Sequence, residues 1–167
     1  MGNNPRHRVP YRRRREGKTD YRARLKLLRS GKARLVVRRS LKHTVVQLVS
    51  YEEAGDRVLA SSTTGQLREL GWTGSTGNTP AAYLAGLMAG RRASKVKITE
   101  AILDIGRIRP SKGSKVFAAL KGVLDAGVRV PHSDEILPSE ERLKGGHLNR
   151  PEIAKLFEEV KQKIIKS

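Results

Sequence analysis

Four adjacent arginines, Arg12 to Arg15, restrict what this chain can fold into more than any other stretch does. A guanidinium group stays charged at every physiological pH, and burying an unpaired charge is too costly for a folded core. These side chains must therefore point into water or toward an anion. The run predicts a segment that binds a partner.

Basic residues continue on both sides of this run and make the charge of the chain strongly uneven. Residues 1–42 contain 16 Lys and Arg but only two acids, so they carry +14 of the formal net charge of +19. Residues 43–167 contain 19 basic and 14 acidic residues, which is closer to an ordinary globular surface. A field of this sign and size favours a polyanion as the partner.

Residues 1–18 contain two prolines, two glycines and almost no apolar side chains. We expect this basic arm to lack fixed structure on its own and to become ordered on a partner. A solvated tail that binds nothing is one alternative, and a nuclear targeting signal is another. The basic residues continue far past the length of such a signal.

The rest of the composition excludes several classes of protein. A chain of 167 residues can bury a real core, cysteine is absent, and the four histidines show no metal-ligand spacing. No run of 18 apolar residues occurs, and no apolar stretch follows the charged N-terminus. We therefore expect a soluble cytoplasmic protein with no cofactor, metal, membrane segment, catalytic residue or small-molecule substrate.

A first helix is expected over residues 20–30, capped by Thr19 and ended by Gly31. Tyr21, Leu25 and Leu28 form an apolar stripe that should pack on the core and leave a basic face outward. A basic face that is merely solvated is the alternative.

The middle of the chain predicts an α/β domain. Residues 35–39, 43–51 and 57–63 are rich in β-branched side chains and should form three antiparallel strands. A helix over 80–94 carries small residues at a spacing of four, so another backbone can approach it closely, and it should be covered on most sides. A buried strand over 100–106 completes a mixed sheet.

The tip of the first hairpin is expected to add basic groups to the neighbourhood of the arm. These groups are Arg38, Arg39, Lys42 and His43.

A glycine-rich loop over residues 71–80 should lead into the middle helix, with Thr79 as its cap and Pro80 at its first position. Its free N–H groups suit a phosphate of RNA, although an ordinary connecting loop is equally compatible. The stretch lacks the ending of a P-loop. Trp72 is either a core residue or a platform for a base, and we favour the core.

Asp104 has two interpretations. RNase H-like nucleases place a metal-binding carboxylate within a central strand, but such sites need further converging acids, and none is obvious here. We therefore favour a hydrogen-bonded structural aspartate. Neighbouring His132, Ser133 and Asp134 predict a turn rather than a catalytic triad.

The last part of the globular domain contains a basic loop over 107–113, a helix capped by Ser114 and stopped by Gly127, and a short strand over 128–130. A linker should follow Pro138. The final helix, with Asn149 as a candidate cap, has an apolar stripe that must pack on the domain itself or on a neighbouring protein or RNA.

These expectations divide the chain into three parts. Residues 1–30 form the arm and first helix, residues 31–135 the α/β domain, and residues 136–167 the linker and C-terminal helix.

Several stretches within residues 6–132 form an ordered set. They are Val9-Pro10-Tyr11-Arg12-Arg13-Arg14-Arg15 with Thr19-Asp20-Tyr21, Ser40-Leu41-Lys42-His43, Gly71-Trp72, Thr76-Gly77-Asn78-Thr79-Pro80-Ala81-Ala82-Tyr83, Leu103-Asp104-Ile105-Gly106 and Gly113-Ser114-Lys115-Val116-Phe117-Ala118-Ala119-Leu120-Lys121-Gly122. Together they resemble the large-subunit ribosomal proteins of the L-eighteen family in its archaeal form, which is related to the eukaryotic L-five. Residues 136–167 match less securely.

The resemblance implies a non-enzymatic protein that binds 5S ribosomal RNA and helps dock it onto the large-subunit ribosomal RNA in the central protuberance, beside neighbouring ribosomal proteins. It also implies the fold of translational-machinery components, related in topology to RNase H. A metal-dependent nuclease with Asp104 as a ligand and a non-specific nucleic-acid-binding protein are the alternatives.

The residues expected to contact RNA combine the resemblance with the charge pattern. They are Arg6, Arg8, Tyr11, Arg12, Arg13, Arg14, Arg15, Lys18, Tyr21, Arg22, Arg24, Lys26, Arg34, Arg38, Lys42, His43, Thr76, Asn78, Lys112 and Lys115.

Overall fold

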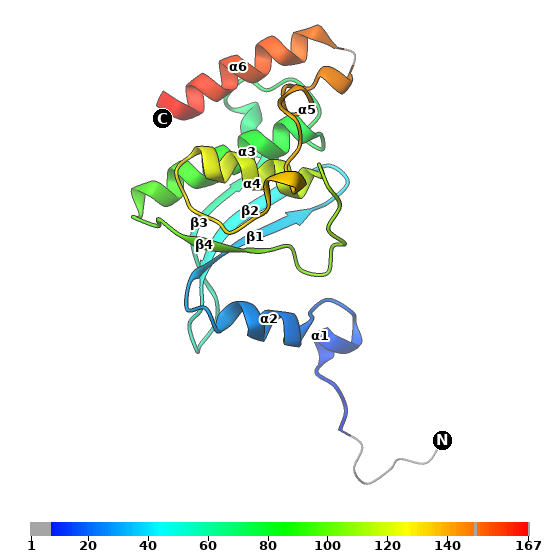
Figure 1. The fold of residues 1–167 in the computed structure, drawn as a ribbon, viewed down its shortest axis with the longest axis vertical. Helices are drawn as coiled ribbons and strands as arrows, with labels where there is room; N and C mark the ends of the chain where they lie inside the picture. Colours follow the sequence, from blue (N-terminus) through cyan, green and yellow to red (C-terminus); the bar gives the residue numbers. More distant parts are fainter. Residues whose placement is uncertain (1–7, 149, 167) are drawn as a thin grey trace, which may run out of the picture.

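Four strands form one mixed sheet in the order β3-β2-β1-β4 in the computed structural model, which describes residues 8–148 and 150–166. The strands are β1 (Ala33–Arg39), β2 (Thr44–Ser50), β3 (Arg57–Thr63) and β4 (Ala101–Asp104). β1, β2 and β3 pair antiparallel, and β4 lies parallel to β1 (Figure 1). The expected three-stranded meander with one parallel strand is therefore confirmed.

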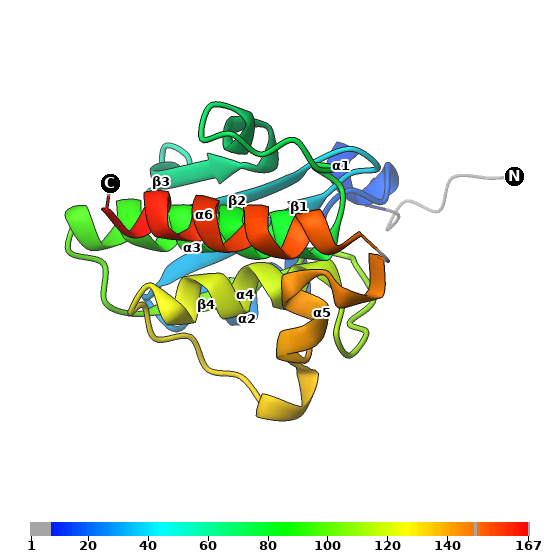
Figure 2. The same cartoon turned by 90° about the horizontal axis from the view of Figure 1, so that it is seen from above.

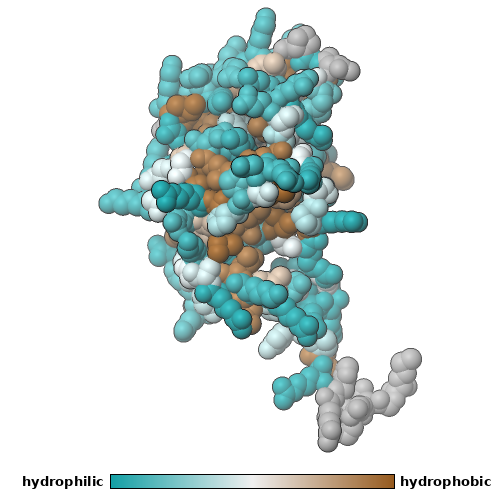
Figure 3. All heavy atoms as spheres, viewed as in Figure 1, coloured by the Kyte–Doolittle hydropathy of each residue, from teal (hydrophilic) through white to brown (hydrophobic). Residues whose placement is uncertain are grey.

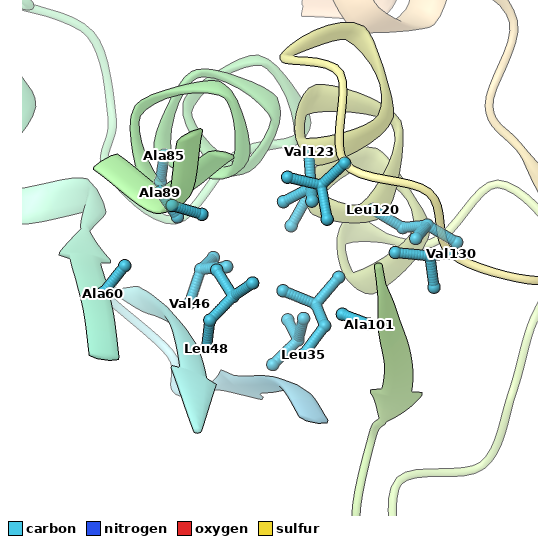
Figure 4. Packing of buried hydrophobic residues seen from close by; sticks show 14 of the residues in the cluster. Leu35, Val46, Leu48, Ala60, Ala85, Ala89, Ala101, Leu120, Val123 and Val130 are labelled. Carbon is cyan, nitrogen blue, oxygen red and sulfur yellow. The ribbon is translucent and has the colours of Figure 1, made fainter. Parts of the chain in front are cut away.

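One face of the sheet carries the core because side chains alternate along each strand. Leu35 and Val37 of β1 and Val46 and Leu48 of β2 are fully buried. They point toward helices α3 (Thr79–Lys95) and α4 (Lys115–Asp125), which cover this face (Figure 4). Close to them, a single bridge between Glu100 and Arg129 replaces the strand expected over 128–130.

Helices α3 and α4 approach so closely that glycine is required at their crossing. A Cβ built on Gly86 of α3 would overlap the carbonyl oxygen of Ala119 in α4. A Cβ built on Gly122 of α4 would overlap the carbonyl oxygen of Tyr83 in α3. The small residues predicted to permit a close backbone approach therefore do so, and the partner is α4.

We expect Gly86→Ala to destabilise the domain by about 3 kcal/mol, because the added methyl meets backbone rather than a movable side chain. The free energy of unfolding, measured in denaturant, checks this value. An unchanged midpoint would mean that the two helices can separate without loss.

The opposite side of α3 supports a second apolar cluster, so this helix is covered on most sides, as predicted. The 3-10 turn η1 (Thr64–Arg68), α5 (Glu140–Lys144) and α6 (Pro151–Lys166) pack there. Phe157, Val160 and Ile164 of α6 are at most 2% exposed, and Figure 2 shows α6 lying along α3. The final helix therefore packs on the domain itself.

Short helical turns replace parts of the chain expected to be irregular. The stretch predicted as a linker contains α5, with Leu143 buried, and the 3-10 turn η3 (Gly146–Leu148). Another 3-10 turn, η2, spans Asp134–Ile136, where a turn was expected. Asn149 lies outside the described residues. No described helix is both long and apolar enough to cross a membrane.

Trp72 is a core residue, as favoured. Only 2% of its surface is exposed, and its indole N–H donates to the carbonyl oxygen of Ser75 at 3.2 Å. It packs in the second apolar cluster, which also contains Leu67, and is not available to stack on a base.

Candidate nucleic-acid interface

The four arginines form a helical turn of their own, α1 (Arg12–Arg15), in which no residue is buried. The amides of Arg14 and Arg15 donate to the carbonyl oxygen of Tyr11, and Nε of Arg13 donates to the hydroxyl of Thr19 at 2.9 Å. The described part of the arm therefore has more order than its composition predicted. Local hydrogen bonds supply that order, and the charged groups remain in solvent.

Helix α2 (Tyr21–Leu28) follows, and its cap and packing differ from the predictions. Asp20, not Thr19, accepts hydrogen bonds from the amides of Arg22 and Ala23. No residue of α2 is buried, and Tyr21 and Leu25 are 37% and 54% exposed. The prediction that the apolar stripe packs on the core was wrong, because the sheet face nearest to α2 is polar.

That polar face lies opposite the core. Arg34 of β1 is only 3% exposed. Its Nη1 donates to Asp104 of β4 at 2.9 Å, and its Nη2 donates to Asp56 at 2.6 Å. Arg38 donates to the other oxygen of the Asp104 carboxylate at 2.9 Å. Two arginines thus share one buried aspartate, which the amide of Gly106 also binds.

The charge of Asp104 is stabilised by these neighbours. Burial opposes ionisation, but hydrogen bonds and charge from Arg38, with help from Gly106 and Arg34, outweigh it and lower the pKa of Asp104. Both carboxylate oxygens are occupied. Among residues 8–148 and 150–166, no group of three His, Cys, Asp or Glu side chains could hold a metal ion. Asp104 is therefore an ion-pair partner of two arginines, which agrees with the favoured structural interpretation.

The ion pairs extend outward to helix α2. Nη2 of Arg24 donates to both oxygens of Asp56, at 2.8 and 2.9 Å. Asp56 lies just before β3, so this pair connects α2 to the sheet. A cleft of about 430 Å³ lies between the arm, α2 and the polar sheet face. Arg13, Arg24 and Arg38 contribute to its lining.

The exposed cations gather on the arm and α2, at the end of the molecule farthest from α6 (Figure 1). We call this set the basic face; it comprises Arg8, Arg12, Arg13, Arg14, Arg15, Lys18, Arg22 and Lys26, all exposed. Figure 3 shows mostly hydrophilic residues over this end. Arg12 and Lys18 lie near Glu16, whereas Arg14, Arg15, Arg22 and Lys26 form no ion pair with another described residue.

Two tyrosines accompany the basic face. The rings of Tyr11 and Tyr21 lie 5.4 Å apart at a tilt of 50°, and Tyr11 is 74% exposed. They pack on each other and not in the core.

Several residues predicted to bind RNA have structural roles. Arg34 does not belong to an RNA-contacting surface, because it is buried between two carboxylates. The hydroxyl of Thr76 is also buried and donates to the backbone carbonyl of Lys42 at 2.6 Å. Asn78, rather than Thr79, caps α3 by accepting from the amide of Ala81.

The start of α3 differs from the phosphate-binding arrangement that its sequence suggested. Asn78 already occupies the cap, and Thr79 and Pro80 are buried. The loop instead fastens the hairpin tip to the body.

Most of the other predicted residues lie apart from the basic face. Lys42 and His43 are exposed at the hairpin tip, where Arg39 and Lys115 line a separate hollow of about 380 Å³. Lys112 pairs with Glu135 at 2.9 Å. Of the hairpin-tip cations, only Arg38 lines the cleft beside the arm. Arg6 lies outside the described residues.

Arg107 lies beside the basic face, although the sequence did not single it out as a contact. With Arg14, Asp20 and Arg22 it lines a hollow of about 340 Å³. Its position in a basic loop directly after a predicted strand was the available signal.

The fold and the basic face together place the protein in a class, that of α/β domains with a strongly basic surface at one end, which suits a polyanion. Comparison with known families is more specific. The model of a family described as "Ribosomal large subunit proteins 60S L5, and 50S L18" matches residues 5–101 and 94–133. Large ribosomal subunit protein uL18 of Methanothermobacter thermautotrophicus is 52% identical over 149 residues, which is 89% of this chain and 77% of that protein.

The chain therefore belongs to the L5/L18 family of large-subunit ribosomal proteins. Its role is structural rather than catalytic, and its place is the large subunit of the cytoplasmic ribosome. Ribosomal RNA and neighbouring ribosomal proteins are its partners.

Proposed function

We propose that the chain binds 5S ribosomal RNA and helps attach it to the large-subunit ribosomal RNA in the central protuberance. The observation that carries this proposal is the basic face, whose eight cations are exposed and lie within residues 8–26, where no side chain is buried. Such side chains contribute little to folding, so their concentration in one place fits a role in binding.

Lys and Arg of this face neutralise closely spaced phosphates and release condensed counterions, which supplies most of the affinity. Arg38, Lys42, His43, Lys112 and Lys115 are proposed as further contacts outside the basic face. Specificity for one RNA comes instead from the shape of the folded RNA and from its unpaired bases. In this proposal residues 1–30 act as the RNA-binding arm, and the α/β domain positions it.

Binding to 5S ribosomal RNA is measured against an equal mass of transfer RNA at near-physiological salt. A preference of at least about tenfold, or 1.4 kcal/mol, is expected for a specific assembly protein. Equal binding would instead identify a general polyanion-binding protein, the alternative that the net charge alone supports.

The salt dependence of this binding measures how many phosphates are engaged. If about eight are neutralised, the logarithm of affinity should fall against the logarithm of salt with a slope of roughly −6 to −7. A slope near −1 or −2 would contradict the proposal that the basic face binds many phosphates of the RNA backbone.

A further inference from the structure

Helix α2 carries part of the basic face but is weakly attached to the domain. None of its residues is buried. Within the described residues, the only ion pair from α2 to the rest of the chain is Arg24 with Asp56. Leu27 and Leu28 are half-buried but belong to neither apolar cluster, so packing against the core does not fix the direction in which Arg22 and Lys26 point.

Asp56 is well suited to fix that direction. It lies in the turn between β2 and β3, and its carboxylate receives Arg24 from α2 on one side and Arg34 from β1 on the other. Arg34 is 3% exposed and is held in turn by Asp104. A surface pair alone is worth little, but this pair is anchored to a buried arginine that two carboxylates hold.

We propose that Asp56 is a positioning residue for RNA binding, which holds α2 and its cations in the orientation that the RNA meets. This inference rests on the proposed function. Its consequence runs against simple electrostatics: removing this negative charge should weaken the binding of a polyanion, although the net charge of the chain rises.

The test compares Asp56→Asn with Glu53→Gln, a matched control. Glu53 is an exposed acid of the same turn and forms no ion pair with another described residue. Both changes remove one negative charge. If the anchored orientation is populated only about a tenth of the time in Asp56→Asn, its affinity for 5S ribosomal RNA falls about tenfold. Glu53→Gln should bind as the unchanged chain does or slightly more tightly.

A double-mutant cycle separates positioning from general stability. In an Arg24→Gln background α2 is already released, so adding Asp56→Asn should weaken RNA binding no further. If Asp56 acted only by supporting Arg34 and the sheet, its effect would persist in that background. Equal or tighter binding by the folded single variant would also overturn the proposal.

Hydrogen exchange of the α2 amides tests the anchor without reference to RNA. Faster exchange of the α2 amides is expected in both Asp56→Asn and Arg24→Gln but not in Glu53→Gln, and in Arg24→Gln it should be confined to α2. Should Asp56→Asn fail to fold, Arg24→Gln carries this test, because Arg24 lies on the outer helix. Unchanged exchange in Arg24→Gln would overturn the anchor, whereas failure of the proposed function would appear separately as equal binding of 5S and transfer RNA by the unchanged chain.

Discussion

Replacing Arg12 to Arg15 by alanine should abolish most 5S ribosomal RNA binding while leaving the domain folded. If all four side chains contact phosphates, the salt slope loses about 3 to 3.5 units. At 0.1 M monovalent salt, relative to a 1 M reference, this corresponds to a loss of about a thousandfold in affinity. The fold should survive because α1 buries no residue.

The control removes four positive charges from the other end of the molecule. Arg142, Arg150, Lys155 and Lys166 are exposed and lie in or beside α5 and α6. Their replacement by alanine should change 5S binding far less than replacement of the arginine run does. Circular dichroism and thermal unfolding are measured for both variants. Loss of folding together with binding in the first variant would show that the arginine turn is structural.

The second large effect concerns stability. Asp104→Ala should lower the free energy of unfolding by about 3 kcal/mol or more, because it leaves the buried Arg34 without its partner on β4. Glu135→Ala breaks the exposed pair with Lys112 and should cost at most about 1 kcal/mol. Denaturant unfolding of the two variants gives the comparison. Equal, small losses would contradict a stabilising role for the buried network.

The same network should make the domain sensitive to acid. The pKa values of Asp104 and Asp56 in the folded chain lie below the ordinary value of 3.8. The unfolded chain therefore takes up protons first, so the stabilisation is present above the unfolded value of 3.8 and is lost as the pH falls through the lower folded values. Asp104→Ala should show a smaller loss over that acid range than the unchanged chain.

The nuclease alternative makes an opposite prediction for Asp104. Magnesium-dependent cleavage of RNA that disappears in Asp104→Asn would be expected of it. Here the carboxylate already binds Arg34 and Arg38, so the expected effect of the substitution is on stability.

Local patterns in the amino-acid sequence predicted the strands and helices of the fold well. β3 begins and ends where the sequence indicated, at Arg57 and Thr63, and β1 and β2 differ by one or two residues at an end. A high content of β-branched residues and small residues at a spacing of four are local signals, and packing agreed with them. The prediction that Thr19 caps α2 was wrong, because Thr19 and Asp20 are adjacent and both residue types can accept from an amide.

Side chains whose role depends on distant residues were harder to assign. In the sequence Arg34 looks like any other cation in a basic stretch. In the fold it pairs with Asp56, just before β3, and with Asp104, at the end of β4. Tyr21 and Leu25 have helical spacing, but the sheet face beside them is charged. Thr76 and Asn78 suggested a phosphate site, but they fasten a loop and cap a helix.

The α/β class, the concentration of positive charge in the first 42 residues and the apolar stripes of the core helices could therefore be predicted from the amino-acid sequence. These follow from composition and periodicity, which are properties of neighbouring residues. Which cations remain exposed and which form buried ion pairs became clear from the folded arrangement. The physical reason is that an arginine becomes a binding or a structural group according to the carboxylates that the fold brings within hydrogen-bonding distance.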